Sequence, residues 1–240
     1  MNLAHILTLM NALLGIISII LSFKGYLVVA VFSIYFGMVF DFFDGKVARM
    51  QHTTSQLGKY LDSIADCITF GIAPIVFVYF SIHSAMHWFI MISLVGYPLC
   101  ACFRLIRYCI EEKDAENESF QGLPVPVSAG CIISFILIFY NLKMDIPVVL
   151  IGFIIIVCSI LMLSNIPYKH VSTILNGRLL TYKYLIVLFV IIGAVIRNHF
   201  FVLFFVGFST YLLWGPVSQV FFKTGTNNRS RSKITIPFKK

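Results

Sequence analysis

The chain has 240 residues, of which 59% are hydrophobic and 12% are charged, and its mean hydropathy is +0.93. A soluble domain of this length cannot bury so much apolar surface, which excludes a water-soluble globular protein. The net charge of +8 favours anionic lipids and anionic substrates as partners, and since no nucleic-acid-binding motif accompanies it, no nucleic-acid partner is expected.

Apolar runs follow one another along the chain. A helix needs roughly 20 such residues to cross the hydrocarbon core of a bilayer. We expect about eight transmembrane helices, at 6–23, 26–43, 61–81, 86–105, 125–142, 146–164, 182–196 and 199–222. Backbone polar groups in lipid must be hydrogen-bonded within the chain, so the predicted fold is an all-α, polytopic membrane helical bundle. The seventh run is short, which also fits a re-entrant or strongly tilted segment.

The expected organisation is a six-helix membrane core over residues 1–170, two additional helices over 171–222 and a basic cytoplasmic tail over 223–240. With the N-terminus inside, 15 of the 18 Lys and Arg residues fall on inner segments, and only three fall outside. Lys and Arg gather on the cytoplasmic side of membrane proteins. We therefore expect a multi-pass protein of the cell (inner) membrane.

Four of the ten acidic residues fall in one stretch, which runs from the end of the second predicted span to the start of the third: Asp41, Asp44, Asp62 and Asp66. The first two are three residues apart and the last two are four apart, so each pair shares a helix face. Carboxylates beside a membrane are costly and indicate a functional site. Because hard oxygen ligands suit Mg²⁺, Mn²⁺ or Ca²⁺, this stretch predicts a divalent metal site on the cytoplasmic side.

Small residues accompany the acids. Gly45 and Ala48 leave one helix face open to a bulky ligand, and Gly58, one turn before Asp62, permits close approach of a helix or a ligand. Arg49 offers a planar guanidinium suited to phosphate oxygens. These residues indicate a pocket for a phosphate-bearing ligand beside the metal site.

Two other interpretations of the stretch stay open. Lys46, Arg49 and Lys59 could neutralise the acids in a purely structural cluster, or the aspartates could line the path of an ion transporter. Salt bridging alone does not require four aspartates on two helix faces, and the aspartates gather at one end of the spans instead of along them. A metal-dependent enzyme is therefore the favoured interpretation.

The stretch resembles the signature of the CDP-alcohol phosphotransferase family at Asp41, Asp44, Gly45, Ala48, Arg49, Gly58, Asp62 and Asp66. The resemblance implies a membrane enzyme that moves a phosphatidyl group from a CDP-linked lipid onto an alcohol and releases CMP. It also implies that the four aspartates hold two divalent ions, Mg²⁺ or Mn²⁺, that the last aspartate serves as general base, and that the protein is a homodimer.

Further stretches are similar to the phosphatidylserine synthases of that family, over roughly residues 3–170: Ile6–Ile19, Leu61–Tyr79, Phe103–Tyr108 and Phe120–Gly130. Thr69 and Ser128 depart from the usual serine and alanine. This resemblance implies CDP-diacylglycerol as donor and L-serine as acceptor. The same chemistry with glycerol phosphate, inositol or inositol phosphate as acceptor remains the alternative.

The resemblance also suggests roles for individual residues. Asp66 would take the proton of the serine hydroxyl in addition to binding a metal. Gly45 and Ala48 would lie under the cytidine, and Arg49 would contact the pyrophosphate or the ribose. The remaining metal ligands would be Asp41, Asp44 and Asp62.

Three residues outside the stretch are further substrate-binding candidates. Arg104 and Arg107 share a face at the inner end of the fourth span, where one could hold the serine carboxylate and the other a lipid phosphate. Alternatively, both are only positive-inside anchors. Asn11 is polar within the apolar first span and could contact nucleotide or phosphate, or hydrogen-bond another helix.

Overall fold

The computed structural model describes residues 3–50, 56–82, 88–111, 119–145, 147–169 and 200–231. The described chain is helical except for two short strands. Its elements are α1 (Leu3–Phe23), α2 (Leu27–Met50), α3 (Gln56–Asp66), the π-helix η1 (Cys67–Ile72), α4 (Ala73–Ser81), α5 (Trp88–Glu111), β1 (Ser119–Gln121), α6 (Val125–Leu142), α7 (Val148–Leu163), β2 (Pro167–Lys169) and α10 (Phe200–Arg231).

Five helices among the described residues are long and apolar enough to cross a membrane: Ala4–Phe23, Leu27–Val47, Leu57–Ser81, Trp88–Cys109 and Val125–Leu142. Two shorter apolar helices follow, Val148–Leu163 and Phe201–Pro216. The predicted helical membrane bundle is therefore confirmed. The predicted span at 182–196 lies outside the described residues, so the count of eight stays a prediction.

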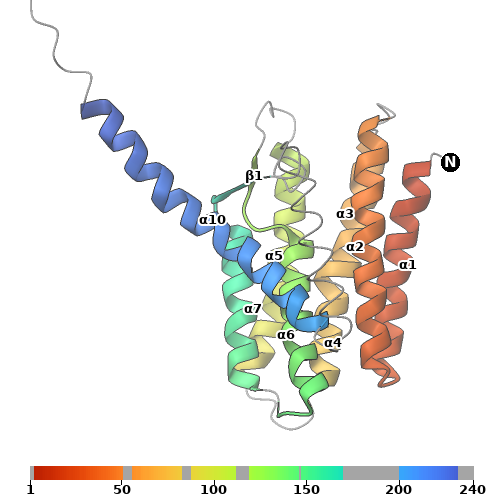
Figure 1. The fold of residues 1–240 in the computed structure, drawn as a ribbon. Helices are drawn as coiled ribbons and strands as arrows, with labels where there is room; N and C mark the ends of the chain where they lie inside the picture. The colour runs from red at the N-terminus through yellow and green to blue at the C-terminus, as the bar shows by residue number, and fades with distance from the viewer. Residues whose placement is uncertain are drawn as a thin grey trace, which may run out of the picture.

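The spans stand side by side, with α1 and α2 at one edge of the bundle (Figure 1). Gly25 makes the tight turn between these two helices possible, because its φ of +80° lies in the left-handed region that other residues rarely adopt. Elsewhere α5 packs against α7, and α6 packs against α10, which crosses the bundle obliquely and projects beyond it.

The third span consists of α3, η1 and α4 in direct succession. In the π-helix each N–H bonds to the carbonyl five residues earlier, as the Ala73 N–H does with Ile68. The wider turn leaves main-chain groups that need other partners, and the hydroxyl of Tyr97 donates to the Phe70 carbonyl at 3.2 Å. Such π-turns are frequent at functional sites, and this one begins directly after Asp66.

The apolar core lies between α2, α4, α5, α6 and α7. Its largest fully buried side chains include Phe77, Tyr97, Ile132 and Ile151. Within this core the Tyr97 hydroxyl also lies 2.7 Å from the hydroxyl of Ser128. Burying a tyrosine is costly unless its hydroxyl finds partners, so this contact and the one to Phe70 let α5 join η1 to α6.

A two-stranded ribbon, which the sequence patterns do not predict, joins the segments before α6 and after α7. Strand β1 pairs with β2 in antiparallel register, with Phe120 opposite Tyr168. The N–H of Gly122 donates to the Ile166 carbonyl at 2.9 Å. The backbone of Gly122 has a φ of +78°, and a Cβ there would lie 2.5 Å from the Met162 carbonyl oxygen, so only glycine fits this position.

The ribbon also fastens α10. The hydroxyl of Tyr168 donates to the Leu212 carbonyl at 3.1 Å, and its ring stacks on Tyr211 with the ring centroids 5.7 Å apart. Helix α10 continues to Arg231, past the predicted end of the last span near residue 222. Hydropathy marks where a span leaves the lipid, but polar residues can continue the helix beyond that point.

Candidate active site

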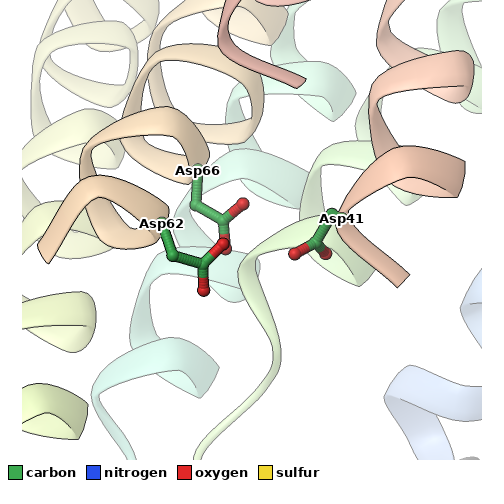
Figure 2. A group of neighbouring side chains, drawn as sticks. All are labelled: Asp41, Asp62 and Asp66. Atoms are coloured by element: carbon green, nitrogen blue, oxygen red, sulfur yellow. The ribbon is translucent and has the colours of Figure 1, made fainter. Parts of the chain in front are cut away.

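Three carboxylates from two helices converge at one end of the spans. Asp41 lies in the second half of α2, and Asp62 and Asp66 lie one turn apart on α3. One carboxylate oxygen from each lies within 4.8 Å of the others. Figure 2 shows Asp62 and Asp66 side by side on one helix, facing Asp41 on the other. The spacing of four residues on α3 produces this arrangement, because it stacks both side chains on one face.

Asp44 does not belong to this group of three, although it is only one turn after Asp41. It is 4% exposed, and its Oδ2 lies 3.0 Å from the hydroxyl of Thr8 on α1. The same hydroxyl lies 3.1 Å from the Ala4 carbonyl, so its single proton is shared between two acceptors. The negative charge of Asp44 still repels that of Asp66, so Asp44 affects the cluster electrostatically.

Asn11 lies behind the cluster on α1 and is completely buried. Its Nδ2 donates to Oδ1 of Asp66 at 3.0 Å. The main-chain oxygen of Asn11 accepts a hydrogen bond of 2.9 Å from the hydroxyl of Thr69. Of the two alternatives open for Asn11, the structure therefore contains the hydrogen bond to another helix, while a contact with nucleotide or phosphate stays a prediction.

Sequence reasoning missed the part that Thr8 and Thr69 play at the site. Both could have been found by spacing, because Thr8 is three residues before Asn11 and Thr69 is three residues after Asp66. Residues three apart share a helix face. A hydroxyl at that distance from a buried polar residue is therefore a candidate partner of the same group.

Arg104 supplies positive charge from α5. Its side chain is 7% exposed, and it interacts electrostatically with Asp66. Its Nε has no hydrogen-bond partner among the described residues. A buried guanidinium with an unused donor is costly unless a ligand supplies an acceptor, which makes Arg104 suited to an anionic group of a substrate.

Arg107 is engaged in a different way, although it lies one turn after Arg104. Its Nη1 donates to Oδ1 of Asn165 at 3.1 Å and lies 3.4 Å from the Leu163 carbonyl. These contacts tie α5 to the end of α7. The two arginines therefore have different neighbours, although the sequence pattern treats them alike.

The small residues beside the aspartates differ in what the structure describes. A Cβ added at Gly45 would meet nothing within 4 Å, so this part of α2 leaves open space beside the aspartates. Gly58 lies in α3, one turn before Asp62, and is partly buried. Helix α2 continues through Ala48 and Arg49, whose side chains lie outside the described ones.

The donor set of the cluster fits a divalent cation. The oxygens of Asp41, Asp62 and Asp66 are hard ligands of the kind that Mg²⁺ and Mn²⁺ prefer. Their charges repel one another. Bringing like charges this close in a half-buried place is costly without a cation between them. The chemistry of these residues therefore fits a divalent metal centre.

The fold and the cluster define a polytopic helical membrane protein with a carboxylate site suited to divalent metals at one end of its spans. The chain belongs to the CDP-alcohol phosphatidyltransferase family, whose model matches residues 1–212. This match confirms the resemblance of the aspartate stretch.

Several curated relatives are similar to this chain. The archaetidylserine synthase of Methanothermobacter thermautotrophicus is 35% identical over 175 residues, which are 71% of this chain and 70% of that protein. The CDP-diacylglycerol–serine O-phosphatidyltransferase of Bacillus subtilis is 36% identical over 145 residues, or 59% of this chain and 75% of the relative. The enzyme of the same name from Helicobacter pylori is 29% identical over 169 residues, covering 69% and 71%.

Proposed function

We propose that this chain transfers the phosphatidyl group of CDP-diacylglycerol to the hydroxyl of L-serine, giving phosphatidylserine and CMP. The observation that carries the proposal is the convergence of Asp41, Asp62 and Asp66 within 4.8 Å in a member of this family. The names of the relatives support serine as the acceptor. One of them is an archaetidylserine synthase, so the acceptor is better supported than the lipid part of the donor.

The aspartates would hold the metal ions of this reaction, which we propose to be two Mg²⁺ or Mn²⁺. Asp41, Asp62 and Asp66 are already gathered, and Asp44 is one turn from Asp41. Bound ions would neutralise the pyrophosphate of the donor and the charge on departing CMP. The open face at Gly45, with Ala48, Arg49 and Gly58, would receive the cytidine and phosphates.

Asp66 would be the general base. Its carboxylate would take the proton from the serine hydroxyl as the serine oxygen bonds to the phosphatidyl phosphorus. The bond from that phosphorus to the bridging oxygen breaks, and CMP leaves with the bonding electrons. Asp66 then returns the proton to water. Its hydrogen bond from Asn11 orients the carboxylate within the site.

Arg104 would hold the serine carboxylate. It is the buried cation whose charge acts on Asp66, and its Nε has no partner among the described residues. A charge-assisted contact of this kind would place the serine hydroxyl beside the base. Arg107, which is bonded to Asn165, is better placed to hold α5 against α7 than to contact serine.

The excess of Lys and Arg on the predicted inner segments supports a place in the cell (inner) membrane with the site facing the cytoplasm. The homodimer implied by the family resemblance is part of the proposal. Size-exclusion chromatography with light scattering on the detergent-solubilised protein measures its mass, and a monomer at micromolar concentration would contradict the dimer.

The experiment that tests the function is incubation of the purified protein with CDP-diacylglycerol, Mg²⁺ or Mn²⁺ and a panel of alcohols. The panel contains L-serine, glycerol 3-phosphate, inositol and inositol phosphate. We expect CMP release that depends on L-serine, with phosphatidylserine as the lipid product by mass spectrometry. Release with another alcohol only would assign a different acceptor. No release with any alcohol, together with metal-ion flux into proteoliposomes, would favour the transporter.

A further inference from the structure

Helix α1 contributes no carboxylate to the metal cluster, yet it contacts two of the four aspartates. Thr8 and Asn11 are three residues apart on α1 and share one face. Thr8 hydrogen-bonds Asp44 of α2, and Asn11 hydrogen-bonds Asp66 at the end of α3, both at 3.0 Å. One face of α1 therefore bridges the two helices that supply all the carboxylates.

The amide of Asn11 is fixed in orientation. The charged carboxylate of Asp66 only accepts hydrogen bonds, so the Nδ2 of Asn11 has to face it. At the same time Thr69, in the π-helix, donates to the main-chain oxygen of Asn11. Asn11 therefore makes two hydrogen bonds to the third span. Its main-chain oxygen accepts from Thr69, and its side-chain amide donates to Asp66.

Two glycines give this network its space. A Cβ at Gly37 of α2 would lie 2.7 Å from Cγ2 of Thr69 and 3.0 Å from Oδ1 of Asn11. A Cβ at Gly15 of α1 would lie 2.8 Å from the Cα of Thr69. Both helices therefore approach Thr69 as closely as backbone allows. The close contact of α1 and α2 with the third span therefore depends on glycine at positions 15 and 37.

We propose that Thr8, Asn11 and Thr69 are positioning residues of the carboxylate cluster. Thr8 and Asn11 would fix Asp44 and Asp66, and Thr69 would fix Asn11. This role rests on the proposed metal-dependent function. It gives Asn11 a task other than contact with substrate.

The physical reason is the repulsion between the clustered carboxylates. A donor on Asp44 and another on Asp66 stabilise the charged forms and limit rotation of the side chains. With one lone pair of Oδ1 of Asp66 engaged by Asn11, Oδ2 keeps both of its lone pairs for a cation or for the proton of the acceptor. Loss of the partners that orient metal ligands commonly lowers metal affinity or activity by about 10- to 100-fold.

The test measures Mn²⁺ binding to the full-length protein in detergent, without substrate. Mn²⁺ is titrated into the protein, and the electron paramagnetic resonance signal reports the Mn²⁺ that stays free. Thr8→Val and Thr69→Val each remove one hydroxyl with little change in volume, and Asn11→Leu removes the amide. We expect Mn²⁺ affinity to fall by about 10- to 100-fold in each. Thr69→Ser keeps the hydroxyl and should bind Mn²⁺ more tightly than Thr69→Val.

Steady-state kinetics at saturating Mn²⁺ provide a second measurement. A positioning role predicts a lower kcat with the KM values for CDP-diacylglycerol and serine nearly unchanged. The matched control is Ser22→Ala, which removes another buried hydroxyl of α1, one that donates to the Ser18 carbonyl at 2.9 Å. This control should bind Mn²⁺ as the wild type does.

The possible outcomes separate this role from the function on which it rests. Wild-type Mn²⁺ affinity in both valine variants would overturn the positioning role alone. So would unchanged Mn²⁺ affinity with a selective rise in the KM for the donor in Asn11→Leu, which would make Asn11 a substrate contact. If Asn11→Leu does not fold, as judged by its thermal unfolding, the valine and serine variants decide. A wild-type protein that does not bind Mn²⁺ would overturn the metal centre itself.

Discussion

Arg107 donates a hydrogen bond to Asn165, with Nη1 and Oδ1 3.1 Å apart, and so joins α5 to the segment after α7. Arg104, one turn earlier on α5, is buried, and its positive charge interacts with Asp66. Two residues that look equivalent in the sequence therefore face different tasks. The first is suited to hold helices together, and the second is suited to hold a substrate.

Replacing Arg104 by alanine should raise the KM for serine, because the serine carboxylate would lose its cationic partner. A charge-assisted hydrogen bond of ~1.5–3 kcal/mol corresponds to a rise of roughly 10- to 150-fold. The KM for CDP-diacylglycerol should change less. Steady-state kinetics with each substrate varied in turn measure both constants. Arg104→Lys should not restore the wild-type value if the contact is bidentate.

Arg107→Ala is the matched control for that experiment. We expect it to lower the thermal stability, because the bonds to Asn165 and Leu163 are lost, while the KM for serine stays near the wild-type value. If Arg107→Ala raises the KM for serine and Arg104→Ala does not, the assignment of the two arginines is reversed. If neither variant changes it, the serine carboxylate is held elsewhere.

Asp66→Asn should lower kcat by at least ~10²-fold, because the amide keeps the shape of the side chain but cannot accept the hydroxyl proton. Donor binding should be largely kept. Asp44→Asn should weaken the binding of metal and of donor in addition to lowering turnover. Single-turnover rates and equilibrium binding of CDP-diacylglycerol separate the two effects. Near-wild-type turnover in Asp66→Asn would refute its role as base.

Removing divalent metal should abolish activity. Dialysis against excess EDTA takes away the ions that the carboxylates of Asp41, Asp62 and Asp66 are suited to hold. Added Mn²⁺ or Mg²⁺ should restore CMP release. The metal content of the purified protein, measured by mass spectrometry, is the companion measurement. Full activity in EDTA, with no metal in the protein, would contradict a metal centre.

Gly15→Ala and Gly37→Ala should each destabilise the protein, because a Cβ at either position would press on Thr69. Overpacking of this kind typically costs about 1–3 kcal/mol. Gly96→Ala in α5 is the matched control, since a Cβ there would meet nothing within 4 Å. Alanine has the higher helix propensity, so this control should be neutral or slightly stabilising. Thermal unfolding in detergent measures the difference, and equal midpoints for all three variants would contradict the close packing.

The sequence was sufficient to predict the helical membrane bundle and a cluster of aspartates from two helices, of which Asp41, Asp62 and Asp66 converge in the structure. Both follow from simple periodicity, because an apolar run of sufficient length has to be helical in lipid, and a spacing of four residues stacks side chains on one helix face. What periodicity cannot supply is the exact direction of a side chain. Residues three apart differ by about 60° around a helix.

That angle explains two features that the sequence pattern did not distinguish, the place of Asp44 among the four predicted metal ligands and the different partners of the two arginines. Asp44 is three residues after Asp41, and its side chain reaches Thr8 on α1 instead of joining the group of three. Arg104 and Arg107 diverge in the same way, toward Asp66 and Asn165. Only the positions of the neighbouring helices decide which partner each side chain meets.

The ribbon and the π-helix could not be predicted because tertiary contacts, not local patterns, determine them. The segment over Cys67–Ile72 is largely apolar, and the Tyr97 hydroxyl that donates to its Phe70 carbonyl comes from a different span. Strand β1 has three residues and pairs with a segment almost fifty positions later. Such a pairing depends on the helices that bring the two segments together.

The π-helix also changes the rotation of one half of the third span relative to the other half. An α-helix turns by about 100° per residue, and a π-turn takes up about one residue more than an α-turn. Helix α4 is therefore rotated about its axis relative to α3. Asp62 and Asp66 can point at Asp41 while Phe77 and Val78 point into the apolar core. One continuous span thus presents its polar face and its packing face in directions that are set independently.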